Sequence, residues 1–139
     1  MRYIADANVL VALIVPQHEH HLRAHRFFMR RAYALTPPTQ LATLQILSRP
    51  RRVGDDILPA LHSAEDALRM VRLLSNKPGT QFVAADLNCA SRLNFAAVTG
   101  HRQWNDFYLV ALAEKNGLML ATFDEGVART FPDRVYLIP

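Results

Sequence analysis

The sequence lacks the chemistry that builds disulfide-rich, metal-thiolate or membrane-spanning proteins. Cys89 is the single cysteine among 139 residues, so no intrachain disulfide, cysteine-based zinc site or iron–sulfur cluster can form. No apolar run approaches the ~20 residues that a membrane span needs, and residues 1–6 lack the apolar core of a signal peptide. We therefore expect a soluble, cytoplasmic protein with no membrane partner, and Cys89 as a small buried residue.

Composition and charge are typical of a folded globular protein. Half of the residues are hydrophobic and 20 % are charged, which excludes a disordered tail, a collagen-like fibre and a low-complexity segment. The length predicts one domain over residues 1–139. Lysine and arginine exceed aspartate and glutamate by 16 to 12, a net charge of +4, which suits a polyanionic partner but is also common among ordinary basic proteins.

Short apolar runs alternate with helical patterns along the chain. The pattern predicts strands over residues 3–5, 33–36, 81–83, 118–122 and 134–138. It predicts helices over residues 8–15, 18–32, 63–75, 87–93 and 104–116, with another between Pro37 and Pro50. Residues 49–62 are interpreted as a connection or an insertion within the domain. Strands that alternate with helices form βαβ units, so we expect the α/β class, with a parallel sheet covered on both faces.

Four polar residues lie where the predicted strands end or the next helix begins. Asp6 follows the first predicted strand, Asp124 follows the fourth, and Asp106 begins the last predicted helix. Gln40 lies in the first turn of the helix after the second strand. Ligands of an open parallel sheet bind outside the carboxyl ends of its strands, so we expect these four side chains at one edge.

A set of three aspartates has an ordinary and a functional explanation. A single aspartate at a strand or helix end is most often a cap or turn residue. Three brought close together raise one another's pKa values, so such a cluster normally needs a divalent metal, and Mg²⁺ or Mn²⁺ suits oxygen ligands. Asn8, two residues beyond Asp6, either hydrogen-bonds a carboxylate or caps the following helix.

Carboxylate-held Mg²⁺ beside a basic surface is typical of phosphodiester chemistry. The metal polarises the phosphoryl oxygen, generates hydroxide and offsets charge in the transition state, so no serine, cysteine or histidine nucleophile is required. Arginines that could follow a nucleic-acid backbone are Arg23, Arg26, Arg30, Arg31, Arg49, Arg51 and Arg52. A solvated charged face is the alternative explanation of each of them.

Three segments resemble motifs of the PIN domain family, in the order in which that family carries them. They are MRYIADANVL at residues 1–10, WNDFYL at 104–109 and LATFD at 120–124. The stretches over 36–41 and 47–50 are also similar to the VapC subgroup, the ribonuclease toxins of bacterial type II toxin–antitoxin pairs. The resemblance covers the whole chain and implies a single PIN domain, a three-layer α/β/α sandwich around a mostly parallel sheet.

The same resemblance implies a Mg²⁺-dependent endoribonuclease, with Mn²⁺ as a substitute. Its metal ligands would be Asp6 and Asp106, and its catalytic residues Asp6, Asp106, Asp124 and Gln40. Asn8 and Arg102 are expected to bind substrate, which would be tRNA, rRNA or mRNA. The expected protein partners are a cognate antitoxin that inhibits the active site and a second copy of the chain in a homodimer.

Gln40 departs from the family pattern, which usually has a glutamate at this position. A neutral amide has one negative charge fewer and keeps a carbonyl oxygen, so the change bears on metal affinity and metal number more than on the reaction class. It also leaves an alternative function open, a catalytically weak PIN module that acts by binding RNA or an antitoxin. A phosphotransferase or phosphatase with Asp6 as nucleophile is a weaker alternative.

Two further groups of residues have both an ordinary and a functional explanation. His18, His21 and His25 would share a helix face and could bind zinc, although no ligand on a second element accompanies them. Trp104 and Tyr108 could stack on a nucleobase, but residues at this helical spacing are more often part of a core. The sequence by itself does not decide either question.

Overall fold

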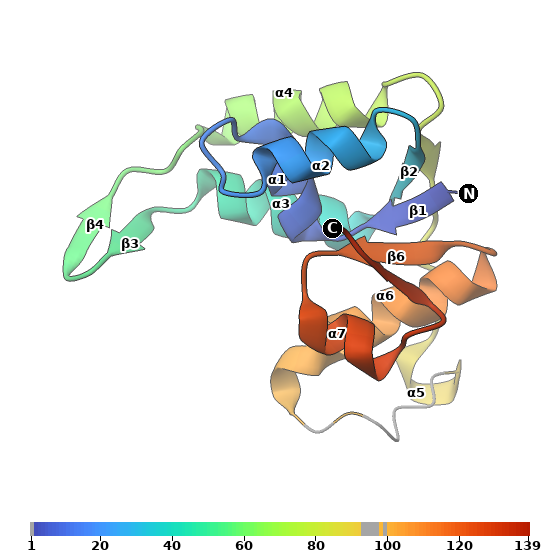
Figure 1. Ribbon diagram of the computed structural model, residues 1–139. Helices are drawn as coiled ribbons and strands as arrows, with labels where there is room; N and C mark the ends of the chain where they lie inside the picture. Colours follow the sequence, from blue (N-terminus) through green and yellow to red (C-terminus); the bar gives the residue numbers. More distant parts are fainter. Residues whose placement is uncertain (1, 93–97, 99) are drawn as a thin grey trace.

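A parallel sheet of five strands forms the centre of the computed structural model, which describes residues 2–92, 98 and 100–139 (Figure 1). The strands are β1 (Arg2–Ala5), β2 (Ala32–Leu35), β5 (Gln81–Phe82), β6 (Met119–Thr122) and β7 (Val135–Leu137). Their order across the sheet is β5-β2-β1-β6-β7, and every adjacent pair is parallel. β1 lies at the centre, so its carboxyl end is enclosed by neighbouring strands on both sides.

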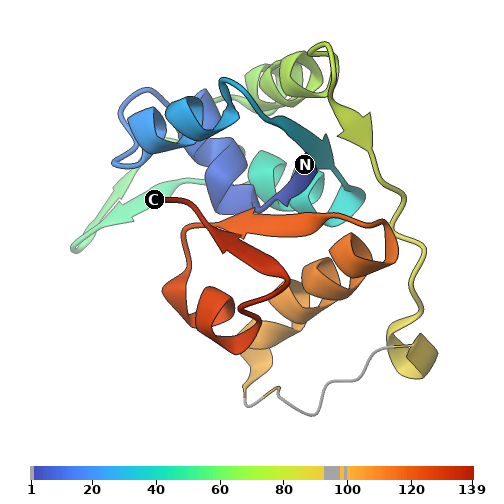
Figure 2. The same cartoon turned by 45° about the vertical axis from the view of Figure 1, so that its right-hand side comes forward.

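Helices cover both faces of this sheet. They are α1 (Ala7–Ile14), α2 (His21–Phe28), α3 (Pro37–Ser48), α4 (Ala64–Ser75), α5 (Cys89–Arg92), α6 (Trp104–Lys115) and α7 (Glu125–Thr130), with a 3₁₀ turn η1 (His101–Gln103) before α6. Figures 1 and 2 show α1 to α4 on one side of the sheet and α6 and α7 on the other. The predicted α/β class and the three-layer α/β/α arrangement are confirmed.

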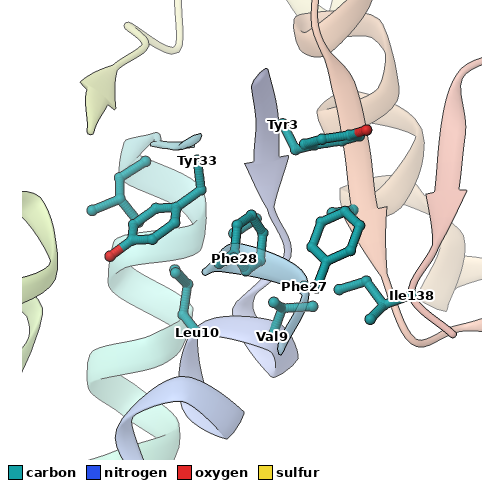
Figure 3. Packing of buried hydrophobic residues seen from close by; sticks show 10 residues of the cluster. Tyr3, Val9, Leu10, Phe27, Phe28, Tyr33 and Ile138 are labelled. Carbon is teal, nitrogen blue, oxygen red and sulfur yellow. The ribbon is translucent and has the colours of Figure 1, made fainter. Parts of the chain in front are cut away.

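Alternate residues of β1 enter opposite cores. Tyr3 points toward the layer of α1 and α2, where its ring lies edge-on to that of Phe27 with 5.1 Å between the centroids (Figure 3). Ile4 is fully buried on the other face, in a cluster with Leu112 of α6. A strand of a parallel sheet is buried on both faces, so it needs apolar residues at successive positions. This requirement explains the short continuous apolar run at the start of the sequence.

A third apolar cluster attaches α3 and α4 to the outside of α1. It joins Val11 of α1 to Leu47 of α3 and Ala67 of α4, all of them buried. Ser63 begins α4 as its N-cap, because its side chain accepts the N–H of Asp66 at 3.1 Å. This packing fixes α3, and with it the first turn that carries a predicted site residue.

The predicted helix over residues 18–32 is too long. α2 spans only His21–Phe28, and Ala32 is the first residue of β2. Before the helix, the ring of His18 accepts the backbone N–H of His20 in a local turn. After it, the Arg31 guanidinium donates to the Phe27 carbonyl at 3.0 Å and satisfies a group at the helix end. These local hydrogen bonds replace the helical ones that apolar spacing alone predicted.

Residues 49–62 contain a β-hairpin that the sequence analysis interpreted as a connection. Its strands are β3 (Arg51–Val53) and β4 (Asp56–Leu58), joined by a two-residue turn in which Gly54 has a φ of 61°. Every residue of both strands is exposed, and Figure 1 shows the hairpin projecting from the helical layer. The hairpin contributes no core face, so the hydrophobic pattern carried no signal for it.

Two other predictions about local structure need correction. The short helix α7 was not predicted, because Gly126 lies inside it and lowers its intrinsic propensity. Cys89 is exposed rather than buried. Of the predicted helix over 87–93 the structure has α5, while Leu93, like Met1 of the first motif, lies outside the described residues. Within the described residues, no helix has the length and apolar character to cross a bilayer.

Leu112→Ala is expected to lower the free energy of unfolding by about 2–5 kcal/mol, because it leaves a cavity where α6 meets the sheet. Ile57→Ala in the exposed hairpin is the control and should change stability by less than about 0.5 kcal/mol. Urea denaturation followed by circular dichroism measures both. Equal losses in the two variants would contradict the placement of the core.

Candidate active site

The strand order changes direction at β1: the strands that follow it in sequence are added first on one side of it and then on the other. The chain moves from β1 to β2 and β5 on one side, and later returns to β6 and β7 on the other. Asp6 directly follows β1, and Asp124 lies two residues beyond the end of β6. The crevice at such a reversal, outside the carboxyl ends of the strands, is where open α/β sheets bind ligands. The two aspartates therefore flank the position that the topology favours for a site.

Asp6 is held in place through both of its carboxylate oxygens. Oδ1 accepts the backbone N–H of Ala7 at 2.7 Å, which makes Asp6 the N-cap of α1. Oδ2 accepts the hydroxyl of Thr122 at 3.0 Å. Burial raises the pKa of Asp6 above its ordinary value, the two hydrogen bonds act in the opposite direction, and the charge of Asp124 adds to the rise. Asp6 is therefore both the N-cap of α1 and a residue at the predicted site.

Thr122 links the two aspartates, and the sequence analysis assigned it no role. Its buried hydroxyl donates to Asp6 and accepts the backbone N–H of Asp124 at 3.1 Å. The second bond joins residue i to residue i+2, the pattern of a Ser/Thr turn. The Thr-x-Asp spacing at the end of an apolar strand was the signal that could have identified it. A single hydroxyl therefore sets the position of the β6–α7 corner relative to Asp6.

Asp124 is an N-cap with an exposed carboxylate. Its Oδ1 accepts the backbone N–H groups of Gly126 at 2.8 Å and of Val127 at 3.1 Å, which begins α7. A side chain at Gly126 would bring its Cβ to 3.1 Å from the same oxygen, so this turn favours glycine by close approach. The cap fixes the carboxylate at the same sheet edge as Asp6.

Asp106 supplies the third carboxylate from the first turn of α6. Its pKa is raised to about 6, chiefly by burial and further by the negative charges of Asp6 and Asp124. Among the described residues, none donates a hydrogen bond to the Asp106 carboxylate. The effect of both other acids on Asp106 is consistent with the expectation of three acids from separate elements near one edge.

The donor set suits a hard divalent cation held in an open site. Asp6 and Asp106 offer carboxylate oxygens whose pKa values are raised by burial and by neighbouring negative charge, and a cation would offset that repulsion. The described residues contain no group of three or more His, Cys, Asp or Glu side chains arranged to hold a metal. Mg²⁺ commonly takes one or two carboxylates and completes its shell with water and substrate phosphate. The arrangement is compatible with that mode and not with a closed cage.

The other predicted site residues lie around this edge without touching the acids. Gln40 is half-buried in the first turn of α3, after β2, and Asn8 is exposed in the first turn of α1. Arg102 is exposed in η1, just before α6. Within the described residues, none of the three makes a hydrogen bond or ion pair with the aspartates. Each is placed where a bound substrate could meet it.

The histidines before and within α2 are bonded elsewhere. The ring of His21 shares a hydrogen bond with the Ala12 carbonyl at 2.7 Å, and that of His25 with the Leu13 carbonyl at 3.1 Å. His20 shares one with the Arg23 guanidinium. These bonds attach the start of α2 to α1, which is a structural role, and the zinc interpretation gains no support.

Comparison with known proteins agrees with this geometry. The PIN domain family matches residues 3–131. The chain belongs to the PIN domain family. Ribonuclease VapC29 of Mycobacterium tuberculosis is 34% identical over 141 residues, covering 100% of this chain and 98% of that protein. Ribonuclease VapC38 of the same species is 32% identical over 127 residues, covering 89% and 86% of the two chains. The resemblance to the VapC subgroup is therefore confirmed.

A solved structure supports the fold independently of sequence. The crystal structure of VapBC2 from Rickettsia felis bound to a DNA fragment from their promoter aligns with a TM-score of 0.65. The alignment covers 100% of both chains at 11% identity. At such low identity the likeness concerns the fold alone. It confirms that a PIN protein can be built on this arrangement of strands and helices.

Asp106→Asn is expected to stabilise the metal-free protein, with a pH dependence that identifies the cause. The folded-state pKa of about 6 exceeds the ordinary value of 3.8, so Asp106 reduces stability progressively as pH rises through this interval. The variant should be more stable by ~1 kcal/mol above pH ~7, since water screens part of the repulsion at this half-exposed position, and the gain should vanish toward pH ~4.

Thermal unfolding in EDTA across this pH range measures the effect. Asp133→Asn, an exposed carboxylate outside the candidate site, is the control and should show no such pH-dependent gain. A destabilised Asp106→Asn variant, or a gain that does not change with pH, would contradict the proposed electrostatic coupling.

Proposed function

We propose that this protein is the toxin of a type II toxin–antitoxin pair, a single PIN domain over residues 1–139 that hydrolyses RNA phosphodiester bonds with Mg²⁺. The observation that carries the proposal is the electrostatic coupling of Asp6, Asp106 and Asp124 at the strand reversal. Burial and neighbouring negative charge raise the pKa values of Asp6 and Asp106, which is costly for a metal-free protein. A bound divalent cation would offset this repulsion. The relatives named as ribonucleases also support a nuclease function.

Each acidic residue takes a role that follows from its surroundings. Asp6 and Asp106 would hold Mg²⁺, with Mn²⁺ as a substitute, and Thr122 keeps Asp6 oriented. The bound metal would polarise the phosphate and lower the pKa of an attacking water. Asp124 adds negative charge from the N-terminus of α7 and would complete the site. Gln40 offers an amide oxygen at the same edge, where it can accept a hydrogen bond from water or a ribose hydroxyl.

A basic region of the chain suits RNA as the substrate. Residues 20–54 contain no aspartate or glutamate, and they include all seven arginines from Arg23 to Arg52. Arg26 and Arg30 are exposed in and just after α2, and Arg102 is exposed beside the first turn of α6. Exposed guanidinium groups bind phosphates bidentately and release counterions. We infer that these side chains, together with Asn8, contact tRNA, rRNA or mRNA.

The comparisons also support the proposed partners. The relatives are VapC ribonucleases, and the structural neighbour is named as a VapBC complex. By analogy we propose a cognate antitoxin that covers the acidic site, a homodimer, and a cytoplasmic location. Exposed apolar side chains such as Leu22 and Met29 on the α2 side offer surface for such contacts.

One alternative function is suggested by the residue at position 40. Gln40 replaces the glutamate usual in the family, which favours a catalytically weak module that acts by binding RNA or an antitoxin. A phosphotransferase that uses Asp6 as a nucleophile is disfavoured, because both oxygens of Asp6 accept hydrogen bonds from the protein. Such bonds stabilise the carboxylate and lower its nucleophilicity.

Purified protein, free of antitoxin, should cleave RNA from a mixed tRNA, rRNA and mRNA panel in Mg²⁺ and stop in EDTA. Asp106→Asn should reduce the rate at least about a hundredfold, because it removes a charge that binds the metal. Asp133→Asn is the matched control and should cleave normally. Product analysis on denaturing gels measures all three. Cleavage by folded Asp106→Asn at the normal rate would contradict the proposal.

Gln40→Glu separates the two functions. If the amide is compatible with catalysis, the added carboxylate should lower the Mg²⁺ concentration for half-maximal activity about tenfold and leave the maximal rate nearly unchanged. Gln45→Glu, on an exposed position one turn later in α3, is the matched control and should change neither quantity. A large rise in rate at saturating Mg²⁺ would favour the weak-module alternative.

A further inference from the structure

An apolar cavity lies at the starts of α3, α5 and α6. Its volume is about 630 Å³, and the described residues that line it are Pro38, Cys89, Ala90, Trp104, Asn105 and Tyr108. None of these six carries a formal charge at neutral pH. These residues provide no cationic side chain to pair with a phosphate, so the cavity suits an uncharged ligand better than a charged one.

The cavity shares two helix starts with the candidate active site. Trp104 and Asn105 directly precede Asp106 in the first turn of α6, and Pro38 lies two residues before Gln40 in the first turn of α3. The walls of the cavity and the acidic residues thus come from the same two helix starts. Asn105, which lines the cavity, and Asp106 are consecutive residues, whose Cα atoms are about 3.8 Å apart.

The lining combines aromatic faces with one amide. Trp104 keeps 49% of its surface exposed, so the interpretation of this residue as part of a core is wrong. Tyr108 lies one turn further along the same face of α6 and is half-buried. Aromatic side chains stack on the faces of nucleobases, and the Asn105 amide has both donors and an acceptor for the edge of a base. A flat, uncharged, heteroaromatic ligand matches this combination.

We propose that the cavity binds one nucleobase of the RNA, on a nucleotide adjacent to the phosphate that is cut. This inference rests on the proposed function. Every phosphodiester in RNA is flanked by two bases, so a phosphate placed at Asp106 brings a base within one nucleotide of the first turn of α6. Among the described residues, the cavity offers an apolar surface at this helix start, and its shape would give the enzyme a preference among bases.

The experiment uses the intrinsic fluorescence of Trp104, the single tryptophan of the chain. Short single-stranded oligoadenylate and oligouridylate are titrated in EDTA into the full-length protein and into Asp106→Asn. The control ligand is an oligomer of the same length with abasic riboses, which keeps the phosphates and lacks the bases. We expect quenching by the two base-bearing oligomers, with an apparent Kd about tenfold lower than that of the abasic oligomer, which should not quench.

Variants test whether the cavity acts in catalysis. Trp104→Leu should raise the KM for RNA about tenfold with little change in kcat and should broaden the choice of cleavage sites. Trp104→Phe keeps an aromatic face and should restore most of both properties. Leu73→Ala removes an exposed apolar side chain on α4 and should change neither. The fluorescence titration needs no change in the cavity, so it stands even if Trp104→Leu fails to fold.

The outcomes separate this inference from the proposed function. Asp6-dependent cleavage without base-dependent quenching, and with an unchanged KM in Trp104→Leu, would overturn the base site alone. Base-dependent quenching in a protein that cleaves none of the RNA panel would support the base site and overturn the nuclease. Equal quenching by the abasic oligomer would overturn the base site. Quenching of Trp104 fluorescence by the antitoxin but not by RNA would overturn the base site and indicate that the cavity binds a segment of the antitoxin.

Discussion

The hydrogen bonds of one buried hydroxyl organise the acidic edge of this protein. Thr122 ends β6, donates to Asp6 after β1, and receives the backbone N–H of Asp124 before α7. These bonds join the two strands between which the chain reverses its direction across the sheet. A hydroxyl can donate once and accept at the same time, so this single group sets both corners. The distance between two negative charges is thereby fixed by the sheet and not by flexible loops.

That fixed arrangement has an electrostatic cost that the fold tolerates. Asp6 and the half-buried Asp106 each have a pKa raised by burial and by a neighbouring carboxylate. Apolar packing on both faces of β1 supplies the stability that offsets this repulsion. The result is a preorganised negative site that a cation and a polyanionic substrate can complete together. Enzymes commonly combine a stable scaffold with a functional site that by itself lowers stability.

Two chemically different surfaces surround the three aspartates, one basic and one apolar. Arginines of the acid-free region over residues 20–54 offer positive charge, whereas the cavity beside Trp104 offers only apolar and amide groups. A nucleic acid presents the same two kinds of surface, a charged backbone and flat uncharged bases. The hairpin of β3 and β4 carries two of these arginines, Arg51 and Arg52, on strands that project from the body with every residue exposed.

The sequence by itself determined the class of fold, the type of most elements, and the three acids at one edge, because period, caps and strand ends are local properties. It could not place the exposed hairpin or the end of α2, where hydrogen bonds such as that from Arg31 to Phe27 override apolar spacing. Only the tertiary structure revealed Thr122 as the link, since its partner Asp6 lies 116 residues away. It also decided that Trp104 is half-exposed, because burial depends on which elements meet.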